Sequence, residues 1–216
     1  KMIAISRLTM SGKPEIWIFE SERRIWRRLT DERGSSLTPI WSPDGRRLFF
    51  SSTLHGDRNL NLYWRPSDGS SPEERVTKFE GYQAPGSFSP DGKLLAFQQG
   101  KDENPDGFDI WMLPMDGDRK PYPFVATRFG EIQPTFSPDG LRIAYLSVRN
   151  GVGEVFLIHR DSVGGRWSAP EQLSRGGGGV PAWSPDGLQL AFGSPSAFKV
   201  RSLDGNERAL VDYAQA

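Results

Sequence analysis

Short apolar runs separated by polar turns recur along the whole chain of 216 residues. The clearest copy places Trp41 before Ser-Pro-Asp-Gly and an apolar run at 48–50 after it, and similar copies begin at Phe88, Phe136 and Trp183. Their serines stand 47 or 48 residues apart. A period of this length is typical of a supersecondary unit that must stack on its neighbours to bury its apolar face. The pattern therefore predicts structural repeats.

Each copy contains four short runs, which we call strands A to D. Strand A ends at the aromatic residue before Ser-Pro-Asp-Gly. Strand B has a large-small-large pattern such as that at 95–97, strand C carries a run such as that at 110–112, and strand D is short and more polar. Repeated sheets of four antiparallel strands, apolar on both faces, pack most simply as blades around an axis with strand A innermost. We predict an all-β fold, a β-propeller.

The N-terminal segment matches only part of this unit. The runs at 3–5 and 16–18 resemble strands B and C, so the first blade is expected to lack its innermost strand. Five blades are visible, four of them complete, and we expect one propeller domain or a fragment of one. The predicted blades are 1–34, 35–81, 82–130, 131–178 and 179–216. The first residue, Lys1, opens a strand pattern at once, and a larger multidomain chain is therefore expected.

The Ser-Pro-Asp-Gly segments have an evident backbone role. Proline presets its own φ, aspartate accepts bonds from nearby N–H groups, and glycine supplies a positive φ. We expect structural turns at the four serines, aspartates and glycines, namely Ser42, Asp44, Gly45, Ser89, Asp91, Gly92, Ser137, Asp139, Gly140, Ser184, Asp186 and Gly187.

Composition narrows the classes of function. The chain has 27 basic and 27 acidic residues and no cysteine, so nucleic acid is not an expected partner and a thiolate site is excluded. All apolar runs are strand-sized, and we expect neither a targeting segment nor direct membrane insertion. No cofactor is expected.

Catalytic chemistry finds little support in the sequence. The predicted inner strands carry no carboxylate pair, the two histidines His55 and His159 fall in different blades, and no G-x-S-x-G motif occurs. Both histidines are interpreted as solvated loop and rim residues. We therefore predict a chain that is not itself an enzyme.

Three short segments admit a second interpretation. Asp102, Asn104 and Asp106 match the opening of a calcium loop, but the twelfth position is Leu113, so a plain polar turn is the alternative. The glycines at 176–179 lack the Lys-Ser/Thr of a phosphate loop. Arginines on the first D strand could form an anion patch or block edge pairing of an outer strand: Arg23, Arg24, Arg27 and Arg28.

The two ends of a blade differ. A–B and C–D connections are mostly short Asp-Gly turns, whereas B–C and D–A loops are longer and more varied. Because loops on a rigid scaffold are free to carry recognition, we place ligand binding on the B–C/D–A face. The candidates are Tyr82, Gln83, Arg128 and Glu131, which precede or enter neighbouring A strands. Ordinary loop residues are the alternative.

These motifs, Pro-x-Trp/Phe before Ser-Pro-Asp-Gly and Asp/Glu-Ile-Trp in strand C, resemble the WD40-like propeller repeats of the TolB family. Similar repeats occur in propellers of prolyl oligopeptidase-type enzymes and in C-terminal regions of bacterial serine/threonine kinases, and residues 116–147 resemble the kinase version most closely. The resemblance implies a six-bladed ring, a bacterial protein and an extracytoplasmic location. It also implies a scaffold that binds a protein, peptide or other ligand in a sensor or interaction region. The alternative is the gating propeller of a hydrolase whose catalytic domain lies elsewhere.

Overall fold

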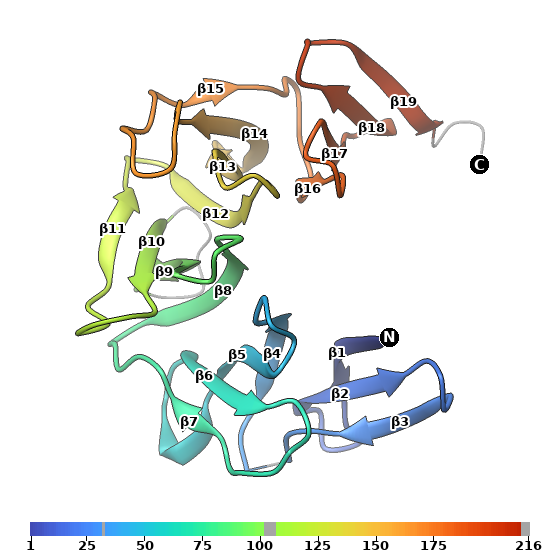
Figure 1. Cartoon of the computed structure of the whole chain (residues 1–216), viewed down its shortest axis with the longest axis vertical. Coiled ribbons are helices and arrows are strands. Elements are labelled where there is room, and N and C mark those ends of the chain that lie inside the picture. Colours follow the sequence, from blue (N-terminus) through green and yellow to red (C-terminus); the bar gives the residue numbers. More distant parts are fainter. Residues whose placement is uncertain (32, 102–106, 213–216) are drawn as a thin grey trace. The chain divides into compact units, whose positions relative to one another are not determined.

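The structure is a computed structural model that describes residues 1–31, 33–101 and 107–212 (Figure 1). Its elements are β-strands apart from one short 3-10 turn, η1 (Leu54–Gly56). Hydrophobic runs of three or four residues, separated by segments rich in glycine, proline and aspartate, favour strands over helices. The expected all-β fold is confirmed.

The strands form five antiparallel sheets in which spatial order follows chain order. Sheet 1 contains β1 (Met2–Leu8), β2 (Pro14–Glu20) and β3 (Ile25–Arg28). Sheet 2 contains β4 (Ser36–Trp41), β5 (Arg47–Ser52), β6 (Asn61–Pro66) and β7 (Glu74–Arg75). Sheet 3 contains β8 (Tyr82–Phe88), β9 (Leu94–Gly100), β10 (Phe108–Pro114) and β11 (Tyr122–Val125).

Sheet 4 contains β12 (Gly130–Phe136), β13 (Arg142–Arg149), β14 (Val152–His159) and β15 (Glu171–Gln172). Sheet 5 contains β16 (Ala182–Trp183), β17 (Gln189–Gly193), β18 (Ala197–Ser202) and β19 (Glu207–Asp212). Four-stranded meanders repeated at this period are propeller blades. Sheet 1 begins with a B strand, as the sequence predicted, and has three strands.

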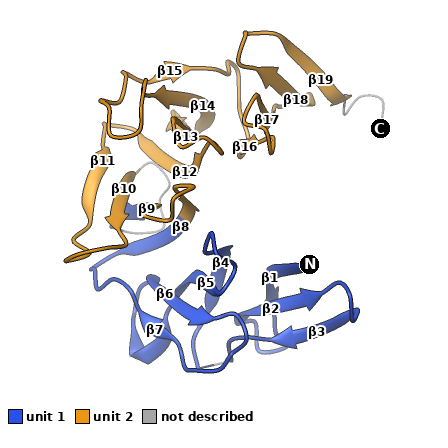
Figure 2. Ribbon diagram, viewed as in Figure 1, with its two compact units in different colours: residues 1–85, 99–103 blue, residues 86–98, 104–216 orange. Residues whose placement is uncertain are grey.

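The chain divides into two compact units (Figure 2). Unit 1 comprises residues 1–85 and 99–103, and unit 2 comprises residues 86–98 and 104–216. In unit 1, Ile16 and Ile18 of sheet 1 pack against Leu48 and Phe50 of sheet 2. Each unit thus buries apolar residues between successive sheets.

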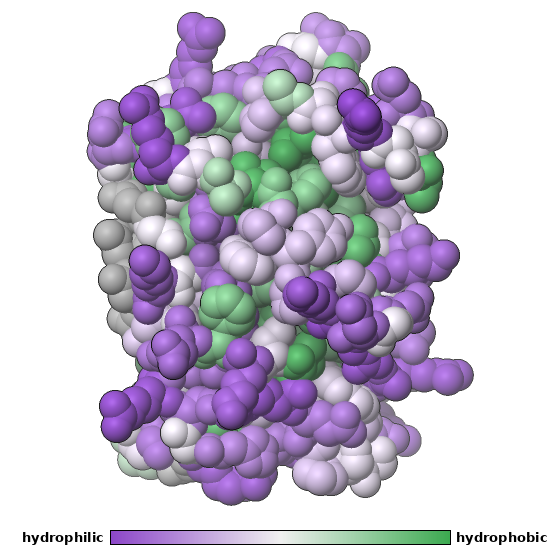
Figure 3. Space-filling view, turned by 90° about the vertical axis from the view of Figure 1, so that its left-hand side faces the viewer, coloured by the Kyte–Doolittle hydropathy of each residue, from purple (hydrophilic) through white to green (hydrophobic). Residues whose placement is uncertain are grey.

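Unit 2 has its own core. Sheets 4 and 5 share a cluster that includes Leu146, Val155 and Phe192, and Ala96 of sheet 3 joins Ile143 of sheet 4 in another. The large-small-large B strands account for this packing, because the small central residue lets the adjacent sheet approach. On the face that Figure 3 shows, hydrophilic side chains surround patches of apolar ones.

The four Ser-Pro-Asp-Gly turns share one geometry. In each, the serine hydroxyl donates to the aspartate Oδ1 over 2.5–2.6 Å, and the glycine N–H donates to the serine carbonyl over 2.8–2.9 Å. The aspartate also accepts an N–H from the residue two positions later. The glycine φ angles lie between +67° and +71°, a region that side chains disfavour. A local pattern therefore builds the same turn four times.

Candidate binding site

In unit 2 we call the end of the sheets that carries the A–B and C–D connections the turn face, and the end that carries the B–C and D–A loops the loop face. The candidate site lies on the loop face, where two arginines project from neighbouring loops. Arg128 lies in the loop between β11 and β12, and Arg149 ends β13.

The arginines share an aromatic partner. The guanidinium carbon of Arg128 lies 4.8 Å from the ring centroid of Phe129, and that of Arg149 lies 4.6 Å from the same ring. Arg149 also lies 4.3 Å from the ring of Phe156. We call Arg128, Phe129, Arg149 and Phe156 the arginine–aromatic cluster. Such contacts hold a guanidinium in place without neutralising its charge.

Within the described residues, neither Arg128 nor Arg149 has a carboxylate within 4.0 Å. Arg149 Nε donates to the Ser147 hydroxyl over 3.3 Å. By contrast, Arg142 on the turn face pairs with Asp139 over 2.5 Å. Arg149 Nε is thus engaged with a hydroxyl, and the guanidinium donors of the cluster have no carboxylate acceptor among the described residues.

Glu131, a residue predicted to bind a ligand, is 1% exposed, and the nearby charge of Arg149 acts on it. Its carboxylate accepts the Thr127 hydroxyl over 2.5 Å and the Thr127 N–H over 3.3 Å. Burial raises the pKa of Glu131, while the Thr127 bonds act in the opposite direction. Glu131 thus fixes the loop that carries Arg128.

Two neighbouring groups extend this buried polar layer. Burial raises the pKa of Asp109, and the nearby Asp109 charge further raises that of Glu131. The pKa of Tyr145 is raised by burial and then by the charge of Glu131, with Arg149 opposing. Glu131 is thus buried and Asp109 half-buried, while Arg128 is exposed and Arg149 half-buried.

The other two residues predicted to bind a ligand are Tyr82 and Gln83, at the start of β8 in unit 1. Gln83 is 1% exposed; its Oε1 accepts the Thr77 hydroxyl, and its Nε2 donates to Gln99 Oε1 over 3.0 Å. Tyr82 is half-buried. The structure therefore brings together Arg128 and Glu131 in one unit, and Tyr82 and Gln83 in the other.

A hollow of about 430 Å³ lies on the same loop face of unit 2. Glycines provide most of its lining, together with one valine, one serine and one proline: Gly151, Val152, Gly153, Gly176, Gly177, Gly178, Gly179, Gly193, Ser194 and Pro195. Arg149 is the register partner of Val152 across the β13–β14 hairpin, so the arginine–aromatic cluster adjoins the hollow.

Glu154 organises the glycine loop from below. Its carboxylate accepts the Ser174 hydroxyl over 2.5 Å and the N–H groups of Gly176 and Gly177 over 2.8 and 3.1 Å. The next two N–H groups, of Gly178 and Gly179, donate to the carbonyls of Gly153 and Gly193. All four amides are used within the protein, so this loop does not offer them to a phosphate.

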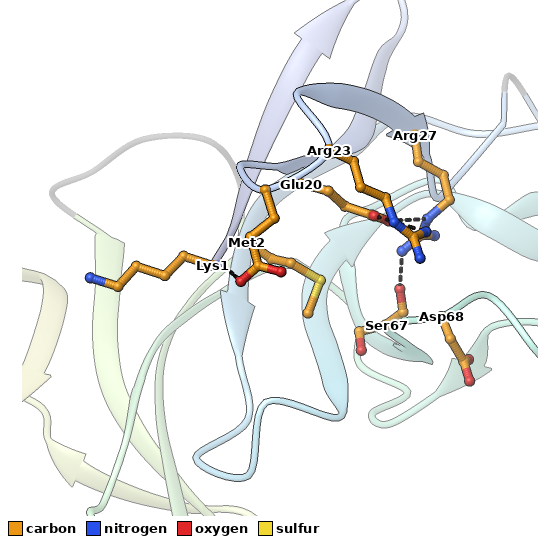
Figure 4. Close-up of a pocket in the computed structure, with 8 residues that line it drawn as sticks. Lys1, Met2, Glu20, Arg23, Arg27, Ser67 and Asp68 are labelled. Carbon is orange, nitrogen blue, oxygen red and sulfur yellow. Dashed lines mark hydrogen bonds and ion pairs between the residues drawn. The ribbon is translucent and has the colours of Figure 1, made fainter.

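A larger hollow of about 620 Å³ lies in unit 1 (Figure 4). Arg27 donates to the Ser67 carbonyl and pairs with Glu20 over 3.5 Å, and Arg23 pairs with the same Glu20 over 3.6 Å. Arg28 pairs with Glu15 over 3.4 Å. The arginines that could have formed an anion patch are thus largely engaged with groups of the protein.

The remaining residues singled out in the sequence are those of the calcium-loop match and the two histidines. Asp102, Asn104 and Asp106 lie outside the described residues, and within the described residues no group of three His, Cys, Asp or Glu could hold a metal ion. His55 stacks on Tyr63, with ring centroids 5.8 Å apart, and His159 Nδ1 lies 3.2 Å from the Ser168 hydroxyl. In the described part of the chain, no helix is long and apolar enough to cross a membrane.

Sequence reasoning missed Arg149 and the roles of Glu154 and Thr127. Arg149 adjoins a B–C loop, a class of loop that the sequence pattern favoured for recognition without singling out this residue. An available signal was the acid before strand C, at Glu15, Asp109 and Glu154, combined with a hydroxyl at the end of strand D. Thr30, Thr77 and Ser174 each accept the N–H of the first apolar residue of strand C in their own sheet.

Comparisons with known proteins bear on the family and the fold of the chain. No protein-family model matches the chain. It is 30% identical over 152 residues to a "Protein TolB homolog" of Chlorobium luteolum, an alignment that covers 68% of this chain and 32% of the relative. The chain thus spans about a third of that relative's length.

Solved structures share the fold. The crystal structure of TolB from Acinetobacter baumannii matches 98% of this chain and 53% of its own, with a TM-score of 0.75 and 19% identity. A puromycin-hydrolyzing peptidase of Mycobacterium tuberculosis matches 98% of this chain and 37% of its own, with a TM-score of 0.71 and 17% identity. Because the sequence relative and the first of these structures agree with the repeat motifs, the chain belongs to the TolB-like β-propeller family.

Proposed function

We propose that the chain is a non-catalytic binding module that holds a protein partner on the loop face of unit 2. The observation that carries the proposal is the arginine–aromatic cluster, in which Arg128 and Arg149 are held over Phe129 without a carboxylate partner in the described residues. Arginines held in a fixed geometry lose little side-chain entropy on binding, and such residues often dominate interfaces.

A binding role is also supported by where the carboxylates are. Glu131 and Glu154 are buried and accept bonds from hydroxyl and amide groups of their own loops. Glycosidase-type catalysis needs two carboxylates facing a substrate. At the His159–Ser168 contact, the serine hydroxyl also accepts the His159 N–H over 3.1 Å, so it fastens a loop to the end of β14.

The wider setting we propose is a sensor or interaction region of a larger bacterial protein, with the extracytoplasmic location that the resemblance of its repeats to the TolB family favours. The second candidate is the substrate-admitting propeller of a peptidase, favoured by the structural likeness to the puromycin-hydrolyzing peptidase. In that case the loop face would contact a catalytic domain of the same protein. Tyr82 remains a candidate contact residue in unit 1.

The test is site-specific photo-crosslinking in the full-length protein in its own host. A photoreactive amino acid replaces Arg128 on the loop face or, as the matched control, Asp204 on the turn face. We expect crosslinks to a second protein chain from position 128 and few from position 204. Crosslinks within the same chain from position 128 would support the peptidase alternative. Crosslinks confined to position 204, or absent from both positions, would contradict the proposal.

A further inference from the structure

The hollow on the loop face has an unusual wall, because most of it carries no side chain. Ideal Cβ atoms built on Gly151 and Gly176 meet no heavy atom within 4 Å, so these positions face open space. At Gly178, in contrast, a Cβ would come within 2.8 Å of the Ser174 hydroxyl and of Val155. Glycine walls let the main chain of a ligand approach closely.

The rim of the hollow is cationic. Arg149 lies opposite Val152 in the hairpin, and the exposed Arg175 directly precedes Gly176. Within the described residues, Arg175 shares with Arg128 and Arg149 the lack of an ion-pair partner. The acids closest in sequence to the hollow and the cluster, Glu154 and Glu131, are 8% and 1% exposed.

The charge and shape of this surface therefore select a partner. Three arginines around a groove with buried acids complement carboxylates, and guanidinium–carboxylate pairs are short and directional. Nucleic acid is a poorer match because the whole chain has no net charge and the two guanidiniums lie over the ring of Phe129, where a base would stack.

We propose that the glycine-lined hollow and Arg128, Arg149 and Arg175 bind an extended acidic peptide segment. Its main chain runs along the glycines, and its Asp or Glu side chains pair with the arginines. This inference rests on the proposed function and names the chemistry of the partner. Affinity should fall as salt rises, because the pairs form at an exposed rim.

The experiment measures fluorescence anisotropy of a labelled ten-residue peptide of alternating Glu and Gly on the whole chain. The same peptide with Gln in place of Glu is the charge control, and an oligothymidine of ten nucleotides is the nucleic-acid probe. We expect binding of the Glu peptide, about tenfold weaker binding of the Gln peptide, and weaker binding still of the oligonucleotide.

Variants separate the rim from the hollow. Arg149→Ala should weaken binding of the Glu peptide about tenfold, and Arg149→Lys should have an intermediate effect. The matched control, Arg166→Ala on the turn face, should leave the affinity unchanged. Val152→Trp should fill the hollow and weaken binding while leaving the arginines in place. Its control is Val163→Trp at an exposed position of the β14–β15 loop.

Equal binding of the Glu and Gln peptides, tighter binding of the oligonucleotide, or unchanged affinity of both Arg149→Ala and Val152→Trp would overturn the inference. Failure of the Glu peptide to bind, with crosslinks to a protein from position 128 retained, would reject the acidic ligand and leave the loop-face proposal standing. Failure of the Glu peptide to bind, together with an absence of crosslinks to a protein from position 128, would reject both the acidic ligand and the loop-face proposal.

Discussion

The two faces of unit 2 use acidic residues in opposite ways. On the turn face, Asp91, Asp139 and Asp186 are exposed. Each accepts hydrogen bonds from residues no more than four positions away in sequence. On the loop face, Glu131 and Glu154 are buried and hold loops together. A local pattern can be copied from blade to blade, whereas a buried acid serves one particular loop. The loop face is therefore free to differ between blades and to carry recognition.

The largest expected effect comes from the acid under the glycine loop. Glu154→Ala leaves the N–H groups of Gly176 and Gly177 and the Ser174 hydroxyl without their acceptor, so the free energy of unfolding should fall by about 3 kcal/mol. Urea denaturation would measure it. The matched control is Glu171→Ala in the same sheet, whose exposed pair with Arg201 spans 4.0 Å. Equal losses in the two variants would remove the contrast between the faces.

A smaller effect is expected on the turn face. Asp139→Ala removes the acceptor of the Ser137 hydroxyl and of the Leu141 N–H and should cost about 1 kcal/mol, as loss of a side-chain cap does. Asp139→Asn keeps the acceptor and should cost less. Denaturation together with peptide anisotropy would check this. Lost peptide binding at unchanged stability would mean that the turn belongs to the binding site.

The smallest effects concern pH, and their signs should be opposite at the two faces. The bonds from the Ser89 hydroxyl and the Lys93 N–H lower the pKa of Asp91 below its ordinary 3.8, so its stabilising contribution is present above that pH and is lost as pH falls through the lowered value. Burial raises the pKa of Glu131 above 4.5, so its favourable contribution exists below that pH and is lost as pH rises.

Variants at these positions sharpen the test. As pH rises from about 4 to about 7, Glu131→Gln should gain stability relative to the parent chain, whereas the deficit of Asp91→Asn should shrink as pH falls below 3.8. Thermal unfolding measured from about pH 2 to about pH 7 would follow both differences. If the stability difference between variant and parent chain changed with pH in the same direction for both variants, the carboxylates of the two faces would not differ in the sign of their pKa shifts.

The strand pattern could be read from the sequence because apolar alternation and Asp-Gly turns act locally. That sheet 1 opens with a strand of the B pattern was likewise visible. The positions of the candidate side chains were harder to predict from the sequence. The A strands β4 and β12 shift register between Leu37 and Ile40 and between Ile132 and Thr135, with positive φ at Thr38 and Gln133. Such a bulge changes which side chains face inward, and simple alternation does not register it.

Contacts across loops were also beyond local reasoning. Gln83 looked like a polar loop residue, but its amide is engaged with Thr77 and Gln99. The guanidinium of Arg149 lies over the ring of Phe129, which is twenty positions earlier in the sequence and belongs to another strand connection. Its importance follows from packing between neighbouring segments, which a single sequence does not specify.

The chain-order arrangement of strands within every sheet has a kinetic consequence. Each pairing joins strands that are neighbours in sequence. Only a short loop must therefore close before interstrand hydrogen bonds offset the entropy cost of closing it. Among the connections of sheet 4, the longest runs from 160 to 170 between β14 and β15. Contact order is therefore low for an all-β chain, and folding can begin in any sheet and spread by adding adjacent strands.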